Sequence, residues 1–340
     1  MITFYPPAES GVELSDLNLC PELTRKAIWI DLFEPTLEEE HALEAALGID
    51  VPTREEMQEI ELSSRLHKEK DVLFMTGTVL LKADTRYPES AVVTFILSPE
   101  RLIVTRYADA LPFKAFRTER EKNPGAYKSG YDILAGMIDA IIDRVADILE
   151  NVGKSLDALS LQVFDTADKN GLISPGKSPS EGARHQTAQH DFSEILRRVG
   201  AVSDLISRAR ESLVSFGRLA SYFREQNQEN ALAREAVAHM KTVAGDVGSL
   251  SDHATFLSGK VSFLLDATLG MIANEQNVII KIISVAAVVF LLPTLVAGIY
   301  GMNFHFLPEL SWRYGYAFAL LLMVISSILP YLYFKRKGWL

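Results

Sequence analysis

The sequence predicts an α+β protein with an N-terminal α/β domain, then long helices, then two membrane-spanning helices at its C-terminal end. Three observations support this class. Short segments rich in β-branched residues alternate with helix signals over residues 1–120. From Tyr127 onward, apolar residues recur with helical periodicity over long stretches. Two uncharged runs, Ile282–Pro308 and Tyr314–Phe334, then cover 27 and 21 residues.

The α/β part is indicated by strand signals and by two helix starts. We expect strands over residues 27–30, 72–81, 91–97 and 101–105, where β-branched residues are concentrated. Thr36 and Glu39 have the spacing of a capping box, which predicts a helix over residues 36–47. Thr53 and Glu56 repeat this spacing, so a second, short helix is expected to begin there.

Three long helices are expected after the α/β part. The first covers residues 127–164 and the second residues 191–226, separated by a segment rich in Gly, Pro and Ser, residues 169–182. The third begins near Glu229 and meets no proline before Pro293. If it continues into the first span, it is about 70 residues or roughly 100 Å long. A helix of this length is not stable alone in water, so it implies a bundle or an oligomer.

Each uncharged run is long enough to cross the hydrocarbon core, which needs about 20 apolar residues. Lys335–Lys337 directly follow the second run, and basic clusters stay on the cytoplasmic side of a membrane. Both termini are therefore expected in the cytoplasm, with the loop between the spans outside. Aromatic residues flank the second span as a membrane-interface belt would: Trp312, Tyr314, Tyr316, Tyr331, Tyr333 and Trp339.

Charge is unevenly distributed along the chain. Residues 278–340 carry a net charge of +4, whereas the whole chain carries −10, so residues 1–277 carry −14. This acidic body argues against nucleic acid as a partner and favours divalent cations or basic partners. Cys20 is the only cysteine, which excludes an intrachain disulfide and a cysteine-rich metal site. Residues 1–10 lack the features of a cleaved secretory signal.

Two motifs match functional patterns but have simpler interpretations. Gly171–Ser178 matches the phosphate-loop pattern G-x-x-x-x-G-K-S, but that loop needs a strand before it and a helix after it. A helix is expected before it, and Pro179 opposes a helix directly after it, so a helix-to-helix linker is the better interpretation. His185 and His190 could be proposed as zinc ligands, but their spacing does not place them on one helical face. No nucleophile–His–acid pattern is evident, and we do not expect an enzyme.

An acidic stripe is a further candidate for a cation-binding site. Asp132, Asp139, Asp143 and Asp147 recur at helical spacing on the first long helix. The simpler interpretation is an exposed, solvated helix face. The alternative is an acidic surface that holds hydrated divalent ions.

The segment between the two spans resembles a known family. Ala297–Phe304 ends the first span with Tyr-Gly-Met-Asn-Phe, and Pro308–Leu310 follows as Pro-Glu-Leu. These residues are similar to the CorA family of magnesium channels, whose hallmark is a Gly-Met-Asn turn between two C-terminal spans. The resemblance continues through Trp312–Tyr316 and Tyr331–Leu340, and upstream in Pro52–Glu61. His305 and Leu307 depart from the usual pattern and leave the detail of the outer mouth open.

The resemblance implies a funnel-shaped homopentamer in the inner (cytoplasmic) membrane, with five first spans lining a pore for Mg²⁺. The selectivity motif would be Gly301, Met302 and Asn303, with Glu309 attracting cations at the external mouth. A ring of Asn303 amide oxygens could bind hydrated Mg²⁺ without stripping its water. Counting back from Asn303 in helical steps gives the expected pore-lining residues: Gly298, Thr294, Leu291, Ala287, Ile283 (or Ser284), Ile280 and Asn277.

Gating is also implied by the resemblance. In the family, cytoplasmic Mg²⁺ binds between protomers and holds the closed state. Asp266 matches one such regulatory carboxylate, and its partner is expected from the segment with Glu55, Glu56 and Glu59. The ion itself is then both cargo and regulator.

The expected function is a channel that admits Mg²⁺, and also Co²⁺ and Ni²⁺, down the electrochemical gradient. The alternatives are a transporter of Zn²⁺ or of divalent metals broadly, a membrane-anchored sensor or scaffold, and a membrane-tethered NTPase. The expected parts are an α/β domain (1–120), a long-helix stalk (121–277), the pore-lining span (278–303), an external loop (304–313), and the second span with its basic tail (314–340).

Overall fold

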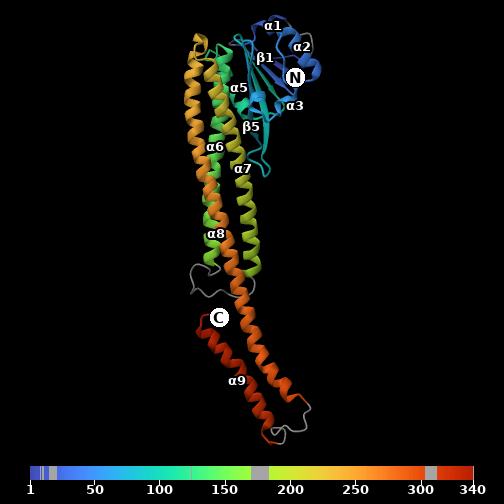
Figure 1. Cartoon of the computed structure of the whole chain (residues 1–340), viewed down its shortest axis with the longest axis vertical. Helices are drawn as coiled ribbons and strands as arrows, with labels where there is room; N and C mark the ends of the chain where they lie inside the picture. The colour runs from blue at the N-terminus through green and yellow to red at the C-terminus, as the bar shows by residue number, and fades with distance from the viewer. Residues whose placement is uncertain are drawn as a thin grey trace. The chain divides into compact units, whose positions relative to one another are not determined.

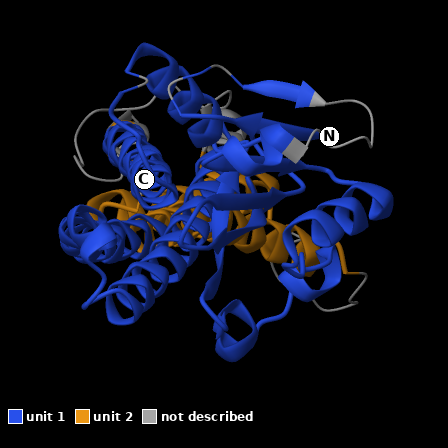
Figure 2. Ribbon diagram, turned by 90° about the horizontal axis from the view of Figure 1, so that it is seen from above, with its two compact units in different colours: residues 1–162, 194–265 blue, residues 163–193, 266–340 orange. Residues whose placement is uncertain are grey.

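The computed structural model describes residues 1–7, 9, 11–14, 21–123, 125–169, 184–302 and 312–339. They divide into two compact units, which Figure 2 shows in different colours. The first unit comprises residues 1–162 and 194–265, and the second comprises residues 163–193 and 266–340.

A seven-stranded sheet forms the N-terminal part of the first unit. Its strands in chain order are β1 (Ile2–Tyr5), β2 (Val12–Leu14), β3 (Trp29–Phe33), β4 (Leu66–Glu69), β5 (Val72–Leu81), β6 (Glu89–Leu97) and β7 (Leu102–Arg106). Their spatial order is β2-β1-β3-β7-β6-β5-β4, with β3 and β7 parallel and all other neighbours antiparallel. The four predicted strands are therefore confirmed, β5 with the predicted bounds and the others shifted by one to three residues at an end. Strands β1, β2 and β4 were not predicted.

Short helices connect and cover these strands. They are α1 (Pro21–Lys26), α2 (Leu37–Leu47), α3 (Arg54–Met57), α4 (Leu62–Arg65) and α5 (Leu111–Lys122). Both predicted capping boxes are present: Thr36 with Glu39 begins α2, and Thr53 with Glu56 begins α3. Each box satisfies two backbone N–H groups that a helix start otherwise leaves without partners.

The two faces of the sheet have different cores. On one face, side chains from β1, β3, β6 and β7 pack with Leu43 of α2 in a single apolar cluster. On the other face, Trp29 stacks on Tyr5 with ring centroids 3.9 Å apart and meets Phe116 of α5 edge-on. Since both faces are covered, β1 has no exposed polar side and lacks the alternating pattern by which a strand is usually recognised.

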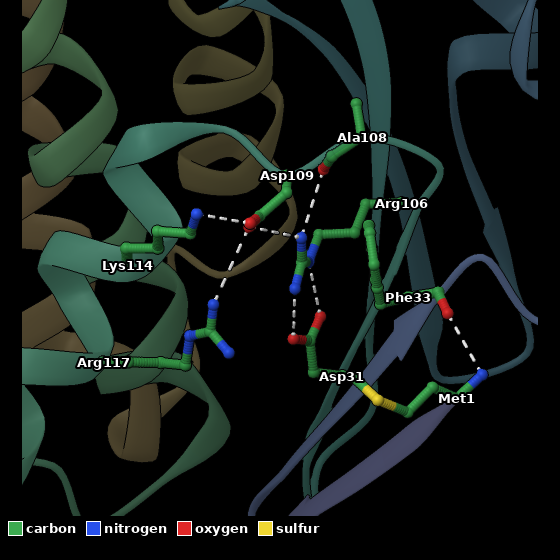
Figure 3. Close-up of polar contacts among 8 residues, drawn as sticks. All are labelled: Met1, Asp31, Phe33, Arg106, Ala108, Asp109, Lys114 and Arg117. Carbon is green, nitrogen blue, oxygen red and sulfur yellow. Dashed lines mark hydrogen bonds and ion pairs between the residues drawn. The ribbon is translucent and has the colours of Figure 1, made fainter.

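A buried ion pair joins the two parallel strands on the α5 side of the sheet. Arg106 of β7 donates to both carboxylate oxygens of Asp31 of β3, at 2.9 and 2.8 Å, and both side chains are 2% exposed. Figure 3 shows that Arg106 also contacts Asp109, which in turn pairs with Lys114 and Arg117 of α5. Burial alone would lower the pKa of Arg106, but the hydrogen bonds and charge of Asp31 outweigh it and raise the pKa. The network therefore couples the sheet to α5.

Parts of three long helices complete the first unit. They are α6 (Gly130–Lys169), α7 (Arg184–Gln226) and α8 (Arg234–Tyr300), with a 3₁₀ turn, η1 (Ala231–Ala233), before α8. In this unit the three helices run side by side (Figure 1), and buried apolar residues recur along each at steps of three and four. Arg198 of α7 donates to Gln162 of α6 at 2.9 Å, and Lys260 of α8 pairs with Asp157 of α6. The bundle supplies neighbours for the part of α8 that belongs to this unit, Arg234–Leu265.

Helix α7 packs against the sheet at a glycine. A Cβ atom on Gly77 of β5 would lie 2.8 Å from Cζ of Phe216 of α7, closer than real Cβ contacts. Phe216 also meets Phe95 of β6 edge-on, and the Ser215 hydroxyl accepts from the Thr78 amide at 2.9 Å. The missing side chain at Gly77 is what lets the Phe216 ring reach the sheet.

Candidate ion pathway

Helix α8 is continuous from Arg234 to Tyr300, so the third long helix does extend into the first predicted span; it belongs to the first unit up to Leu265 and to the second from Asp266. There it lies beside α9 (Gly315–Arg336), which runs in the opposite direction (Figure 1). Both helices are long and apolar enough to cross a membrane. Many of their large apolar side chains are exposed, among them Phe290 at 74% and Leu291 at 68%. So extended an exposed apolar surface needs lipid or further protein to cover it.

A hydrogen bond between α9 and α8 is made at the level of Val289, one turn before Pro293. Proline has no N–H, so the carbonyl of Val289, four residues earlier, receives no hydrogen bond from within α8. The Ser327 hydroxyl of α9 donates to that carbonyl oxygen at 3.3 Å. A neighbouring hydroxyl thereby satisfies the acceptor that the proline leaves free, the usual way in which membrane helices tolerate proline. Pro293 lies inside α8 without ending it.

Val289 marks the face of α8 that contacts α9. Val285 is buried at 3% exposure, and Leu292 and Val296 are half-buried at helical spacing from it. The predicted pore-lining residues from Ile280 to Gly298 lie about half a turn away, at 100° per residue. All of these predicted residues are exposed: Asn277, Ile280, Ile283, Ala287, Leu291, Thr294 and Gly298. This side of α8 is thus free of α9, and the assignment of the pore to it stays a prediction.

The free side of α8 is apolar at its middle levels and carries polar residues, Asn277 and Thr294, toward its two ends. Ile280, Ile283 and Leu291 are 60%, 62% and 68% exposed. Between Leu291 and the end of the helix, the Thr294 hydroxyl donates to the Phe290 carbonyl at 2.6 Å, which leaves its lone pairs to accept from a hydrated ion. Asn277 offers an exposed amide at the opposite end of this side.

The structure describes the turn after α8 only as far as Met302. The Gly301 amide donates to the Ala297 carbonyl at 2.9 Å, and the Met302 amide donates to the Ile299 carbonyl at 3.2 Å. A Cβ on Gly301 would lie 3.1 Å from the Ala297 oxygen, so glycine is favoured here by a close backbone approach rather than by a left-handed conformation. The remaining predicted residues of the mouth lie outside the described residues: Asn303, His305, Leu307 and Glu309.

The predicted regulatory carboxylates fall in different units, Glu56 and Glu59 in the first and Asp266 in the second. All three are exposed. Oxygen Oε2 of Glu56 accepts from the backbone amide and the hydroxyl of Thr53, at 2.8 and 2.9 Å, so this carboxylate already serves as a helix cap. The part of the chain that the structure describes holds no group of three or more His, Cys, Asp or Glu side chains able to bind a metal ion.

The residues of the acidic stripe on α6 differ in their roles, because one of them is engaged in hydrogen bonds that begin the helix. The Asp132 carboxylate caps the start of α6, accepting from the Lys128 and Ser129 amides at 3.0 Å each, so it is a structural residue. Burial, and then the charges of Asp139, Asp147 and Asp246, raise the pKa of Asp143. Asp246 belongs to α8 and was missed from the sequence, because only the packing of α8 on α6 brings it to this stripe. No feature of its own sequence neighbourhood signals the contact.

The phosphate-loop match, Gly171–Ser178, lies outside the described residues, so its interpretation as a linker stays a prediction. Nothing is described of the side chains of His185 and His190.

A mixed sheet, a bundle of long helices and a pair of exposed apolar helices are the parts expected of a two-span membrane protein with a large extramembrane body. The family model described as "CorA-like Mg2+ transporter protein" matches residues 25–175 and 181–336. The chain therefore belongs to the CorA family. The family that the Gly-Met-Asn turn indicated is therefore confirmed.

Relatives match along nearly the whole chain. A magnesium transport protein CorA of Pasteurella multocida is 32% identical over 340 residues, covering 100% of both chains. A magnesium transport protein CorA of Sodalis glossinidius is 34% identical and covers 92% of both. The solved CorA magnesium transporter of Methanocaldococcus jannaschii matches the structure with a TM-score of 0.73 at 16% identity, covering 100% of this chain and 99% of that one. The predicted fold class is therefore confirmed.

Proposed function

We propose that this chain forms a homo-oligomeric channel that carries Mg²⁺ across the inner (cytoplasmic) membrane, with both termini in the cytoplasm. The observation that carries the proposal is the face of α8 opposite α9, exposed at every level from Asn277 to Gly298. A relative of the chain that is named as a magnesium transport protein matches its full length, including α8. Five copies of the face, arranged as a pentamer, would enclose a pathway.

The chemistry of this face suits a hydrated divalent cation. Mg²⁺ gives up its water reluctantly and prefers oxygen ligands. Hydroxyl oxygens of Thr294 and amide oxygens of Asn303 and Asn277 can hydrogen-bond the hydration shell without trapping the ion as a carboxylate ring would. Rings of Leu291 and Ile280 supply apolar constrictions that can close by dewetting. A divalent ion gains about 4.6 kcal/mol per 100 mV on entry, which is sufficient for uptake without ATP.

Liposome flux of Mg²⁺, Co²⁺, Ni²⁺ and Zn²⁺ tests the proposal, with the native chain compared with Asn303→Ala. We expect Mg²⁺, Co²⁺ and Ni²⁺ to enter and Asn303→Ala to change the flux or the preference among ions. Flux of Zn²⁺ alone would favour the zinc transporter, and absence of all flux would favour a sensor or scaffold.

The pore-lining assignment has a matched control in α9. Leu291 and Leu321 are both exposed, at 68% and 57%, and lie on different helices. If Leu291 forms a constriction, Leu291→Ser should increase the flux by wetting the pathway, whereas Leu321→Ser should leave it unchanged. Equal effects of the two substitutions would remove Leu291 from the pore.

Cytoplasmic Mg²⁺ is proposed to hold the closed state by binding at Asp266 and an acidic residue of another protomer. Because Glu56 is engaged as a cap, Glu59 is the stronger candidate for that partner. Asp266→Lys should weaken the inhibition of flux by internal Mg²⁺. An unchanged inhibition curve would exclude Asp266 from the mechanism.

A further inference from the structure

Four basic residues lie at about the same level of the α8–α9 pair. The Ser327–Val289 contact sets the register of the two antiparallel helices. Eight positions from it along α9 (327 to 335) is Lys335, and eight positions back along α8 (289 to 281) is Lys281, each about 12 Å away at 1.5 Å per residue. Arg336 and Lys337 follow Lys335 at once. We call Lys281, Lys335, Arg336 and Lys337 the basic cluster.

Within the described parts of the two spanning helices, no acidic residue balances the basic cluster. Residues 276–302 and 312–339 contain no Asp or Glu. All four basic side chains are exposed, and none forms an ion pair with any residue that the structure describes. Nζ of Lys335 lies 5.9 Å from the ring centroid of Tyr331, and Nζ of Lys337 lies 5.2 Å from that of Tyr333. These cation–π contacts hold two ammonium groups against the surface of α9 without neutralising their charge.

The basic cluster adjoins an apolar surface that can receive acyl chains. Ile282 on α8 and Ile328 and Leu332 on α9 are 45%, 49% and 50% exposed. A ligand that complements both features carries a phosphate at one end and hydrocarbon at the other. Clusters of four or more Lys and Arg at the cytoplasmic end of a membrane helix are typical binding sites for anionic lipids.

We propose that the basic cluster binds the phosphate headgroup of an anionic phospholipid, whose chains lie along the adjoining apolar surface of α8 and α9. This inference rests on the proposed function in one respect, the placement of the two helices in a bilayer. The lipid would brace the end of α9 against α8 at the level where the long helix leaves the membrane.

Lipid retention by the full chain tests the proposal. The protein is purified in a neutral detergent, incubated with equal amounts of phosphatidylglycerol and phosphatidylcholine, and separated from free lipid by size exclusion. The bound lipids are then extracted and quantified. The native chain should be enriched in phosphatidylglycerol, and rising salt should reduce this enrichment. Recovery of the two lipids in the supplied ratio would overturn the proposal.

Charge substitutions localise the binding. Lys281→Gln with Lys335→Gln should reduce the enrichment by roughly fivefold for each residue removed. Arg313→Gln is the matched control, because Arg313 is exposed just before the opposite end of α9 and should not affect retention. The charge-preserving pair Lys281→Arg with Lys335→Arg should retain the native preference, which separates a charge effect from misfolding. An unchanged preference in the Gln pair would refute the site.

Two further measurements complete the test. One distinguishes a lipid headgroup from free phosphate as the ligand, and the other distinguishes failure of the lipid site from failure of the proposed channel. Glycerophosphate in excess should not displace the lipid, and full displacement would show a site for free phosphate instead. Retention is measured without flux, so the results are independent. A chain that carries Mg²⁺ but does not select phosphatidylglycerol refutes only the lipid site, whereas the reverse result refutes only the channel.

Discussion

The hydroxyl of Ser327 should stabilise the packing of α9 on α8 only because Pro293 is present. Ser327→Ala removes the donor at 3.3 Å from the Val289 carbonyl oxygen and leaves that acceptor without a partner in the apolar region. Hydrogen bonds between membrane helices contribute about 0.6 kcal/mol on average and up to about 1.7 kcal/mol. Because Ser327→Ala leaves the Val289 carbonyl oxygen without a partner, we expect its loss of stability to lie in the upper half of this range.

A double-mutant cycle isolates this interaction. In a Pro293→Ala background, the new amide at position 293 can donate to Val289 within α8, so removing the Ser327 hydroxyl should then cost almost nothing. The free energy of unfolding in mixed micelles is measured for all four chains at one protein concentration, because oligomerisation would otherwise shift it.

Ser326→Ala is the matched control. Its hydroxyl donates to the Met323 carbonyl at 2.8 Å within α9, so its loss breaks no contact between the helices. The predicted role of Ser327 is refuted if Ser326→Ala and Ser327→Ala lower the free energy of unfolding equally. It is also refuted if Ser327→Ala lowers the free energy of unfolding as much with alanine at position 293 as with proline.

Three further predictions concern the extramembrane body. Burial and neighbouring carboxylates raise the pKa of Asp143, so its ionised form destabilises the fold above that pKa; Asp143→Asn should raise the melting temperature at neutral pH, and the gain should vanish in acid or with added Mg²⁺. Burial opposes ionisation of Asp109, but its basic neighbours still lower its pKa. Its stabilising effect should therefore be present above about pH 4 and lost as pH falls through the lowered value, a dependence that Asp109→Asn should remove from a pH series of melting temperatures. Gly77→Ala should destabilise by about 1–3 kcal/mol because its Cβ would strike Phe216, whereas Gly200→Ala, with open space around it, should not destabilise; equal unfolding midpoints in denaturant would contradict this.

Features that depend on neighbours in the chain could be predicted from the sequence. The caps of α2 and α3 need only residues three positions apart, and both formed as predicted. The absence of proline between Glu229 and Pro293 allowed a continuous helix into the first span, and the structure shows that α8 is continuous. The family followed from a short motif between two spans, because its position is as distinctive as its letters.

Features that depend on packing could not be predicted in this way. Strand β1 has no alternating pattern because both of its faces are covered, and Asp246 joins the acidic stripe only where α8 lies against α6. A proline at position 293 indicates a missing hydrogen bond within α8, but only the tertiary structure places Ser327 beside the carbonyl that this proline leaves free. The sequence by itself determined the three long helices, the two apolar runs and the caps of α2 and α3, since these depend on local hydrogen bonds and hydropathy. The tertiary structure alone decided which polar groups meet, because residues far apart in the chain must pack before their charges and hydroxyls can interact.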